Sequence, residues 1–371
     1  MLDLEKAKAQ GTYREFKDTA SFEKSIRFGS KNLLNLASND YLGIATSRTL
    51  RDEFLETIKI KDVFFGSGAS RLVYNSSDAF YELENWFEKR LNKKALIFNS
   101  GYSANLGVIS AMADPKTLFV ADKLIHASMI DALQLSKANL KRFAHNDMEA
   151  LSRILEKEHS AYETIIVLTE SVFSMDGDIA DLKTMVSLKK QYENVKLYVD
   201  EAHSFFALNE LGIVHSQNLD NEIDFILITL SKALGGSGAV FLCNQEMREI
   251  LINSARSLIF STAIPSVDVA WTSFILSKDF SDRRKNLQEC VDFLGLSKTQ
   301  ICPFIVGENE DTLALAKDLT DAGFFVPAIR PPTVPVHTSR LRISLRGDIT
   351  AEELKPLKEI LDAYSKAHLQ S

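Results

Sequence analysis

Cysteine is scarce in this sequence of 371 residues, which contains only Cys243, Cys290 and Cys302. Their spacing matches no metal-binding motif, so we expect no metal site, and their small number suggests a reducing compartment. The first residues lack the apolar core of a signal peptide, and no apolar run is long enough to span a bilayer. We therefore expect a cytoplasmic protein with no membrane partner.

An excess of positive charge is also missing. The formal net charge is −7, so the chain offers no basic surface for nucleic acid. The sequence has no internal repeat and no low-complexity segment. It also lacks a Gly-x-Gly-x-x-Gly turn after its first strand and a Gly-Lys-Ser/Thr phosphate loop. A non-catalytic nucleotide-binding module, with the glycines at 235–238 around a phosphate, is therefore only a remote alternative.

What the chain does contain is an alternation of short apolar runs with helical patterns. Strands of a mostly parallel sheet with helices on both faces are the expected result, which is an α/β fold. The expected strands are 95–98, 117–120, 165–168, 197–200, 225–228 and 239–242, the last as an antiparallel neighbour. The expected helices are 78–91, 103–112, 126–135 and 182–191.

The pattern divides the chain into three parts. Residues 1–45 are expected to be an N-terminal arm, helical to about residue 30, with a strand at 33–36. Residues 46–270 form the expected large α/β domain. Residues 271–371 form a smaller α+β domain, with strands at 301–306, 324–326 and 341–344 and helices at 313–322 and 352–367.

A lysine follows one of the most apolar strands. Residues 225–228 precede Thr229, Ser231 and Lys232, and glycines follow at 235, 236 and 238. Open α/β sheets bind ligands at the carboxyl ends of their strands, and glycines let the backbone approach a ligand. Lys232 is therefore a candidate for a Schiff base with an aldehyde cofactor such as pyridoxal phosphate. The alternative is a solvated lysine on a glycine-rich loop.

Other strand ends carry residues suited to the same cofactor. Asp200 can keep a pyridine nitrogen protonated, or it can simply cap a helix. His203 can bond a ring hydroxyl, or it can be a satisfied core histidine. His126 can stack on a flat ring, and Ser174 can reach the cofactor edge or make a local turn bond.

Two further features favour anion binding. Gly101 and Tyr102 lie between a strand and a helix, where backbone N–H groups and the helix N-terminus bind phosphate. Arg340 and Arg342 lie on one side of a strand by its period of two, and one of them can grip a carboxylate with two hydrogen bonds. Two solvated arginines on an edge strand are the alternative.

In this order, the motifs resemble the α-oxoamine synthases, pyridoxal-phosphate enzymes of fold type I. The resemblance runs from about residue 35 to the C-terminal helix. It is carried by Ser-Asn-Asp-Tyr-Leu-Gly at 38–43, Asn-Ser-Gly-Tyr-Ser-Ala-Asn at 99–105, His-Ala-Ser at 126–128, Glu-Ser-Val-Phe-Ser-Met-Asp-Gly-Asp at 170–178, Asp-Glu-Ala-His-Ser at 200–204 and Thr-Leu-Ser-Lys-Ala-Leu-Gly at 229–235.

The resemblance implies roles for the residues around the cofactor ring. Lys232 is implied as the Schiff-base lysine and proton carrier, and Asp200 as the partner of the ring nitrogen. His126 is implied to stack on the ring, with Ser174 and His203 at the ring hydroxyl.

It also implies a phosphate site shared between two subunits. Gly101, Tyr102 and Thr229 are implied to hold the phosphate, and Ser261 and Thr262 to reach it from a second subunit. A homodimer is therefore expected.

The substrate residues implied by the resemblance lie near the two ends of the chain. Arg342 is implied to bind the amino-acid carboxylate, with Thr333 and Asn39 lining the site and Arg14 as a thinner match. Residues 143–147 and 328–335 favour L-alanine and a pimeloyl thioester, carried by coenzyme A or by an acyl carrier protein. Glycine with a shorter acyl group is the alternative, because one methyl group discriminates by only about 1–3 kcal/mol.

One stretch departs from the family. After His203 the family usually has Ser-x-Gly-x-x-Gly, whereas this chain has Ser204 followed by Phe205 and Phe206. The two bulky rings put the shape of the acyl channel in question and leave the cofactor chemistry untouched.

Overall fold

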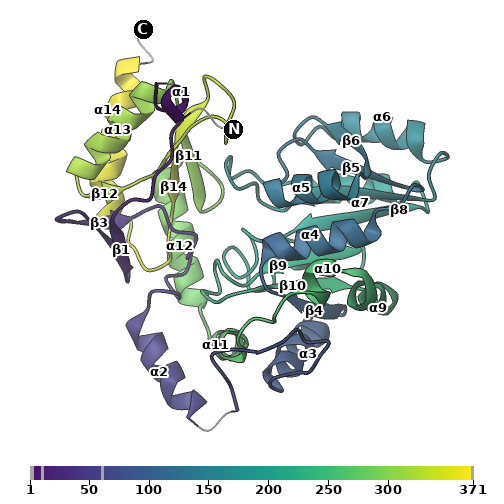
Figure 1. Ribbon diagram of the computed structural model, residues 1–371. Helices are drawn as coiled ribbons and strands as arrows, with labels where there is room; N and C mark the ends of the chain where they lie inside the picture. Colours follow the sequence, from purple (N-terminus) through teal and green to yellow (C-terminus); the bar gives the residue numbers. More distant parts are fainter. Residues whose placement is uncertain (1–3, 10–11, 60–61, 369–371) are drawn as a thin grey trace. The chain divides into compact units, whose positions relative to one another are not determined.

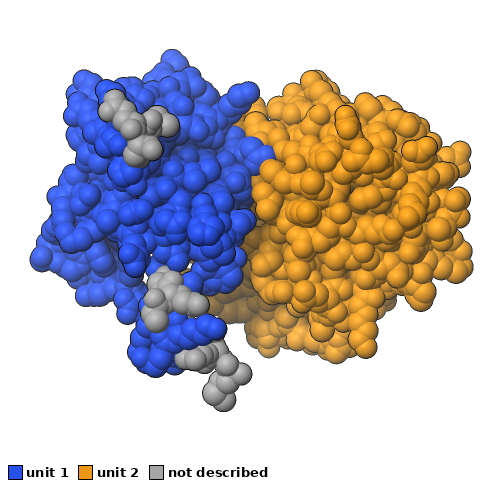
Figure 2. Space-filling model, turned by 90° about the horizontal axis from the view of Figure 1, so that it is seen from above, with its two compact units in different colours: residues 1–48, 174–178, 280–371 blue, residues 49–173, 179–279 orange. Residues whose placement is uncertain are grey.

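The computed structural model describes residues 4–9, 12–59 and 62–368. The chain forms two compact units, which Figure 2 shows in different colours. Unit 1 comprises residues 1–48, 174–178 and 280–371, and unit 2 comprises residues 49–173 and 179–279. The expected three-part division stays a prediction, because compactness says which residues pack together and not which of them fold independently.

Unit 2 is built on a sheet of seven strands in the order β4-β10-β9-β8-β7-β5-β6. Only β10 runs antiparallel to its two neighbours, as expected for residues 239–242. The strands are β4 (Lys94–Phe98), β5 (Thr117–Asp122), β6 (Asn139–Phe143), β7 (Thr164–Glu170), β8 (Val195–Asp200), β9 (Phe225–Thr229) and β10 (Ala239–Cys243).

Unit 2 also contains helices, several of which lie beside this sheet in Figure 1. They are α2 (Arg48–Ile58), α3 (Ala79–Leu91), α4 (Gly101–Met112), α5 (Ala127–Ser136), α6 (Met148–Glu158), α7 (Leu182–Lys189), α8 (Gly212–Ser216), α9 (Gln245–Ser254), α10 (Arg256–Ile259) and α11 (Ser266–Leu276). Every residue of β5 and of β10 is buried, so these strands need cover on both faces, as in a doubly covered α/β sheet.

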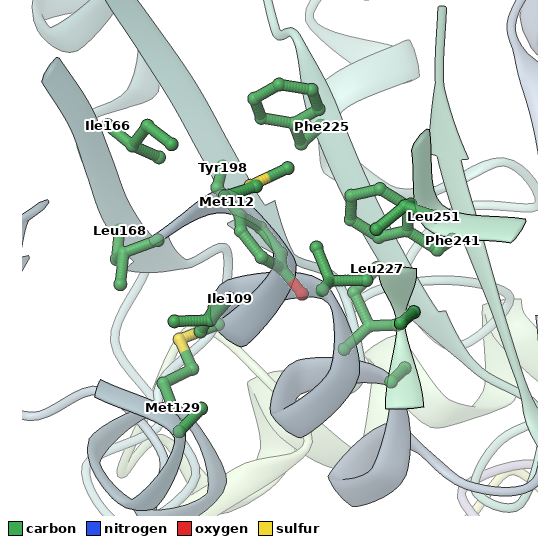
Figure 3. Close-up of a cluster of buried hydrophobic side chains, with 14 of the residues drawn as sticks. Ile109, Met112, Met129, Ile166, Leu168, Tyr198, Phe225, Leu227, Phe241 and Leu251 are labelled. Carbon is green, nitrogen blue, oxygen red and sulfur yellow. The ribbon is translucent and has the colours of Figure 1, made fainter. Parts of the chain in front are cut away.

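One hydrophobic cluster of the core of unit 2 lies between one face of this sheet and helices α4, α5, α9 and α10. Alternate strand residues supply the cluster, because successive side chains of a strand point to opposite faces. Figure 3 shows Tyr198 of β8 among Ile109, Leu168 and Leu227. Tyr198 is fully buried, so the core holds one phenol whose hydroxyl needs a polar partner.

Unit 1 contains two smaller sheets, ordered β1-β2-β3-β12 and β11-β14-β13. The strands are β1 (Thr19–Phe22), β2 (Ser25–Phe28), β3 (Lys31–Asn35), β11 (Ile301–Gly307), β12 (Phe324–Phe325), β13 (Ala328–Ile329) and β14 (Ser339–Ser344). The helices are α1 (Leu4–Ala9), α12 (Ser281–Leu294), α13 (Asn309–Asp321), α14 (Lys355–His368) and the short 3-10 helix η1 (Glu352–Leu354).

The N-terminal prediction of a helix to about residue 30 is wrong from Thr12 onward. Strands β1 and β2 form an antiparallel pair in that region, and β2 pairs in turn with β3. In β2 a buried Ile26 is followed by an exposed Arg27, a period-two pattern hidden among charged residues. Residues 1–3 and 10–11, which this prediction included, lie outside the described residues.

Within residues 4–9, 12–59 and 62–368, no helix is both long enough and apolar enough to cross a membrane.

Candidate active site

The carboxyl ends of four neighbouring strands in unit 2 carry acidic or hydroxyl side chains. Asp122 ends β5, Glu170 ends β7, Asp200 ends β8 and Thr229 ends β9. These strands pair in parallel, so their ends lie along one edge of the sheet. This is the edge at which α/β sheets bind ligands.

Lys232 projects from the turn that follows β9 and meets a histidine. Its Nζ lies 2.8 Å from His203 Nε2, and His203 is 3% exposed. The turn is closed by a hydrogen bond from the Gly235 amide to the Lys232 carbonyl, and Gly235 has a φ of 62°, which favours glycine. The backbone thus fixes a lysine amine and an imidazole at hydrogen-bond distance.

Asp200 is buried and held at both carboxylate oxygens. Oδ1 accepts from the Ala202 amide at 2.9 Å, and Oδ2 accepts from Asn105 Nδ2 at 3.3 Å. No helix starts here, since the next one, α8, begins at Gly212. The helix-capping interpretation of Asp200 is therefore wrong, and the residue makes a local turn bond instead.

Asn105 of α4 links Asp200 to the rest of the edge. Its amide also donates to Ser128 Oγ at 3.0 Å, and its Oδ1 accepts from the Tyr198 hydroxyl at 2.5 Å. Asn105, Ser128 and Tyr198 are at most 1% exposed, so each depends on these partners. The result is a buried polar network from the core phenol to the strand-end carboxylate.

His126 ends this network at the start of α5. Its Nδ1 accepts from the Ser128 amide at 3.2 Å and lies 2.8 Å from Ser128 Oγ, so the side chain itself caps the helix. Loss of water around the ring lowers the pKa of His126; the negative charge of Asp200 opposes this shift and the positive charge of Lys232 adds to it. An accepting Nδ1 places the proton of the neutral ring on Nε2. The residue as a whole stays exposed, which leaves room for a flat ligand beside it.

Gly101 and Tyr102, the residues predicted to bind phosphate, are the first two residues of α4. Ser100 caps this helix by accepting from the Ser103 amide at 3.1 Å, so the Gly101 and Tyr102 amides precede the first intrahelical bond. A Cβ on Gly101 would stand 2.7 Å from Thr229 Oγ1. Only glycine lets the helix start and the end of β9 approach this closely, and the result is a cradle of backbone N–H groups and one hydroxyl.

The segment with Ser261 and Thr262 is tied to the same turn of its own chain. Asn99 donates from Nδ2 to the Thr262 carbonyl at 2.6 Å, while the Thr262 residue remains exposed. A role for these two residues in the phosphate site of a second subunit stays a prediction.

Glu170 was not singled out from the sequence, although it stands in a quoted motif. It is 2% exposed, and its Oε1 has no hydrogen-bond partner among the described residues. Burial raises the pKa of Glu170 well above its usual range, and the neighbouring charge of Asp200 raises it further. A strand-end position was the signal available for it, the same signal that identified Asp200.

In unit 1, the side chain of Arg342 on β14 is buried and donates several hydrogen bonds. Its Nε donates to the Ser174 carbonyl at 2.5 Å, and one Nη donates to Asn39 Oδ1 at 3.1 Å and to Ser344 Oγ at 2.6 Å. Arg340 pairs with Asp176 at 2.6 Å. Strand β14 lies between β11 and β13, so the interpretation as solvated edge-strand arginines is wrong.

Two other predicted substrate residues of unit 1 also meet. Arg14 donates to Thr333 Oγ1 at 2.8 Å, and both are exposed. Unit 1 thus brings Ser174, Asn39 and Arg342 into one group and Arg14 and Thr333 into another. The described part of the chain holds no group of three or more histidine, cysteine, aspartate or glutamate side chains suited to a metal ion.

Comparison with known proteins places the chain in a family. The sequence profile of aminotransferase class I and II matches residues 31–361. Relatives named "Putative 8-amino-7-oxononanoate synthase", from Haemophilus influenzae and Neisseria gonorrhoeae, are 44% identical over 367 residues, covering 95% of this chain and 97% of each relative. The chain belongs to the α-oxoamine synthases of this aminotransferase family.

Solved structures agree with that family. Serine palmitoyltransferase from S. paucimobilis with a bound PLP–myriocin aldimine is 26% identical, with a TM-score of 0.86 over 98% of this chain and 96% of that one. The 8-amino-7-oxononanoate synthase of Francisella tularensis is 27% identical, with a TM-score of 0.77 over 91% and 99% of the two chains. The family and the fold predicted from the motifs are confirmed.

The stretch that departs from the α-oxoamine synthase pattern is buried in unit 2. Phe205 packs against Phe87 of α3, with ring centroids 5.7 Å apart. Phe206 stands at the first glycine of the family pattern, and its φ of 64° lies in the region that favours glycine. Phe206 thus takes a backbone conformation that favours glycine, and both phenylalanine rings are buried in unit 2.

Proposed function

We propose that this α-oxoamine synthase condenses L-alanine with a pimeloyl thioester to form 8-amino-7-oxononanoate, a step of biotin synthesis. The bond from the alanine Cα to its carboxyl carbon breaks and carbon dioxide leaves. A new bond joins that Cα to the acyl carbon, and the thiol departs. The observation that carries this proposal is the meeting of Lys232 with His203 beside the fixed Asp200, in a chain whose 44% identical relatives bear the name of this synthase.

Pyridoxal phosphate is the cofactor, and the residues of unit 2 fit it. The Gly101 cradle suits a phosphate, the Lys232 amine suits an aldehyde, and the accessible His126 ring suits a flat partner. When bound, the cofactor supplies an electron sink for negative charge at the amino-acid α-carbon.

Two side chains of the protein, Asp200 and Lys232, are assigned the proton-handling roles of the reaction. The Asp200 carboxylate is held by the Ala202 amide and by Asn105, which fixes it as a partner for a protonated ring nitrogen. Lys232 Nζ, oriented by His203, is the base for the α-proton of alanine. A positioned base of this kind typically contributes about 10²–10⁴-fold.

The amino-acid carboxylate is assigned to Arg342. The buried guanidinium is held in a fixed orientation by the Ser174 carbonyl through Nε and by Asn39 and Ser344 through Nη1. Nη2, 3.4 Å from the Tyr41 hydroxyl, is the nitrogen left to donate to the carboxylate. Arg14 and Thr333 form a second polar pair in unit 1, which we assign to the substrate side as well.

A homodimer with shared phosphate sites is part of the proposal. Phe260, directly before Ser261, is 70% exposed, and Phe64 and Phe65 are 51% and 82% exposed. Large exposed aromatic side chains of this kind favour an interface over open solvent. Active protein that sediments as a monomer would reject this part.

Product analysis with a matrix of substrates tests the reaction. L-alanine and glycine are each supplied with pimeloyl, succinyl and acetyl thioesters, on coenzyme A and on acyl carrier protein. We expect the pair of alanine and pimeloyl to give the highest kcat/KM. If glycine with acetyl or succinyl is faster, the biotin-pathway assignment fails and the family assignment stands.

A further inference from the structure

A cavity of about 400 Å³ opens at the other edge of the seven-stranded sheet of unit 2. Its wall includes Lys94 at the start of β4, Lys196 in β8, Phe225 at the start of β9 and Cys243 at the end of β10. Strand β9 separates this edge from Thr229 at the catalytic edge. With a rise of about 3.3 Å per residue, the two ends of β9 lie about 13 Å apart. The cavity is therefore not part of the site described above.

Positive charge exceeds negative charge in this cavity. Lys94 pairs with Glu88 at 2.7 Å, and Asp224 is shared by Lys189 at 2.6 Å and Lys196 at 3.6 Å. Both carboxylates are thus already engaged.

Lys93 also lines the cavity, and neither of these carboxylates forms an ion pair with it. Across residues 4–9, 12–59 and 62–368 its amine makes no hydrogen bond or ion pair, and the carboxylates of Asp224 and Asp220 act on it only at longer range. It is only partly exposed, and loss of water around the amine lowers the pKa of Lys93. A half-buried ammonium without a partner is costly, and an anion beside it would recover that cost.

The remainder of the wall suits an organic ligand. Phe225, which is 7% exposed, and the buried Ile223 and Cys243 form the apolar floor of a cavity whose other lining residues are polar or charged. Amide side chains such as Asn221 supply hydrogen-bond donors around it. The volume lies in the range of small-molecule sites, and the polar wall suits a charged ligand.

We propose that this cavity is a binding site for a small organic anion, whose carboxylate or phosphate pairs with Lys93 and whose body rests on the floor formed by Ile223 and Phe225. The site is independent of the cofactor and of the proposed reaction, so its failure would leave both untouched.

Competitive labelling of the holoenzyme tests the site. An amine-acylating reagent is applied to the wild-type protein, and tandem mass spectrometry follows the modification rates of Lys93 and of the exposed Lys89 on α3. Benzoate and inorganic phosphate are titrated separately as probes. We expect saturable protection of Lys93 by at least one probe, with no protection of Lys89. Stronger protection by benzoate identifies a carboxylate on an apolar body, and stronger protection by phosphate identifies a phosphoryl group.

Calorimetry with the better probe adds a second measurement. Lys93→Met keeps most of the apolar stem and removes the charge, and we expect at least a tenfold loss of affinity. Lys89→Met is the matched control and should bind as the wild type does. The proposal is overturned if neither probe protects Lys93 in the wild-type protein, or if Lys89 is protected equally, since equal protection reports only general screening by salt.

Discussion

The two edges of the seven-stranded sheet carry similar residue types in different states. At the carboxyl edge, Asp200 is fixed by Asn105 and by a backbone amide, and Lys232 meets a buried histidine. At the amino edge, Lys94 and Lys196 make ion pairs while partly exposed, and Lys93 has no ion pair within the described chain. Buried hydrogen bonds thus fix the orientation of side chains at the carboxyl edge, whereas at the amino edge an excess of positive charge lines a cavity.

Removing the catalytic-edge lysine should have the largest effect. We expect Lys232→Ala to lose the visible absorbance band of the lysine–cofactor linkage and its reduction by borohydride, and to lower kcat by about 10²–10⁴-fold or more, because the base is gone. Lys89→Ala, on the exposed face of α3, should keep both band and rate. A reducible protein-bound band in Lys232→Ala without added amino acid would contradict the assignment of this lysine.

Neutralising the strand-end carboxylate should have the next largest effect. Asp200→Asn keeps an acceptor for the Ala202 amide but removes the negative charge from the ring nitrogen site. We expect kcat/KM to fall by about 10²-fold or more, in line with the loss of one preorganised electrostatic partner. Asp282→Asn on exposed α12 is the control. Equal kcat/KM for Asp200→Asn and the wild type would remove Asp200 from the proposed mechanism.

The network behind Asp200 should matter less and mainly through position. Tyr198→Phe leaves Asn105 Oδ1 without its 2.5 Å donor inside the core, which should cost about 1–3 kcal/mol of unfolding free energy. A roughly tenfold drop in kcat with a displaced pH profile is expected, because Asn105 then holds Asp200 less well. Loss of stability with an unchanged pH profile would make Tyr198 a core residue only.

The sequence pattern was enough for most strands of unit 2, because they are continuous apolar runs separated by helical patterns. It missed β6, whose intermediate and exposed residues alternate at the sheet edge. It also missed the strands β1 and β2, since charged side chains hide their pattern. Short edge strands depend on their neighbours for pairing, and no local pattern announces those neighbours.

At the candidate site, strand ends predicted which residues meet at one edge. The sequence did not predict the second layer, because Asn105 and Ser128 lie on helices and look like ordinary polar residues there. Their role depends on burial, which only the fold supplies. The arginines of β14 show the same limit, since their period placed them on one side of a strand and left a solvated edge strand as the alternative, whereas the fold places that strand in the centre of its sheet.

The smallest effect concerns Glu201, the residue after Asp200, and appears only in the pH dependence of stability. Glu201 is 1% exposed, and its Oε1 accepts from the Val214 amide at 2.9 Å and from Ser204 Oγ at 3.0 Å. Burial raises the pKa of Glu201 from 4.5 to about 7, against these hydrogen bonds. Between these values the folded chain holds a proton that the unfolded chain has lost.

Stability should therefore fall as the pH rises from about 4.5 to 7, and then level off. The contribution of this one group is at most about 3 kcal/mol, since one pKa unit corresponds to about 1.4 kcal/mol. Glu201→Gln keeps the shape and the acceptor oxygen but cannot ionise, so urea unfolding of this variant at a series of pH values should lack that fall. Glu82→Gln, at an exposed position of α3, should keep it. The unfolding free energy of the wild type and of Glu201→Gln is plotted against pH. If the two plots run parallel between pH 4.5 and 7, Glu201 is already ionised in the folded protein, and burial does not control its protonation.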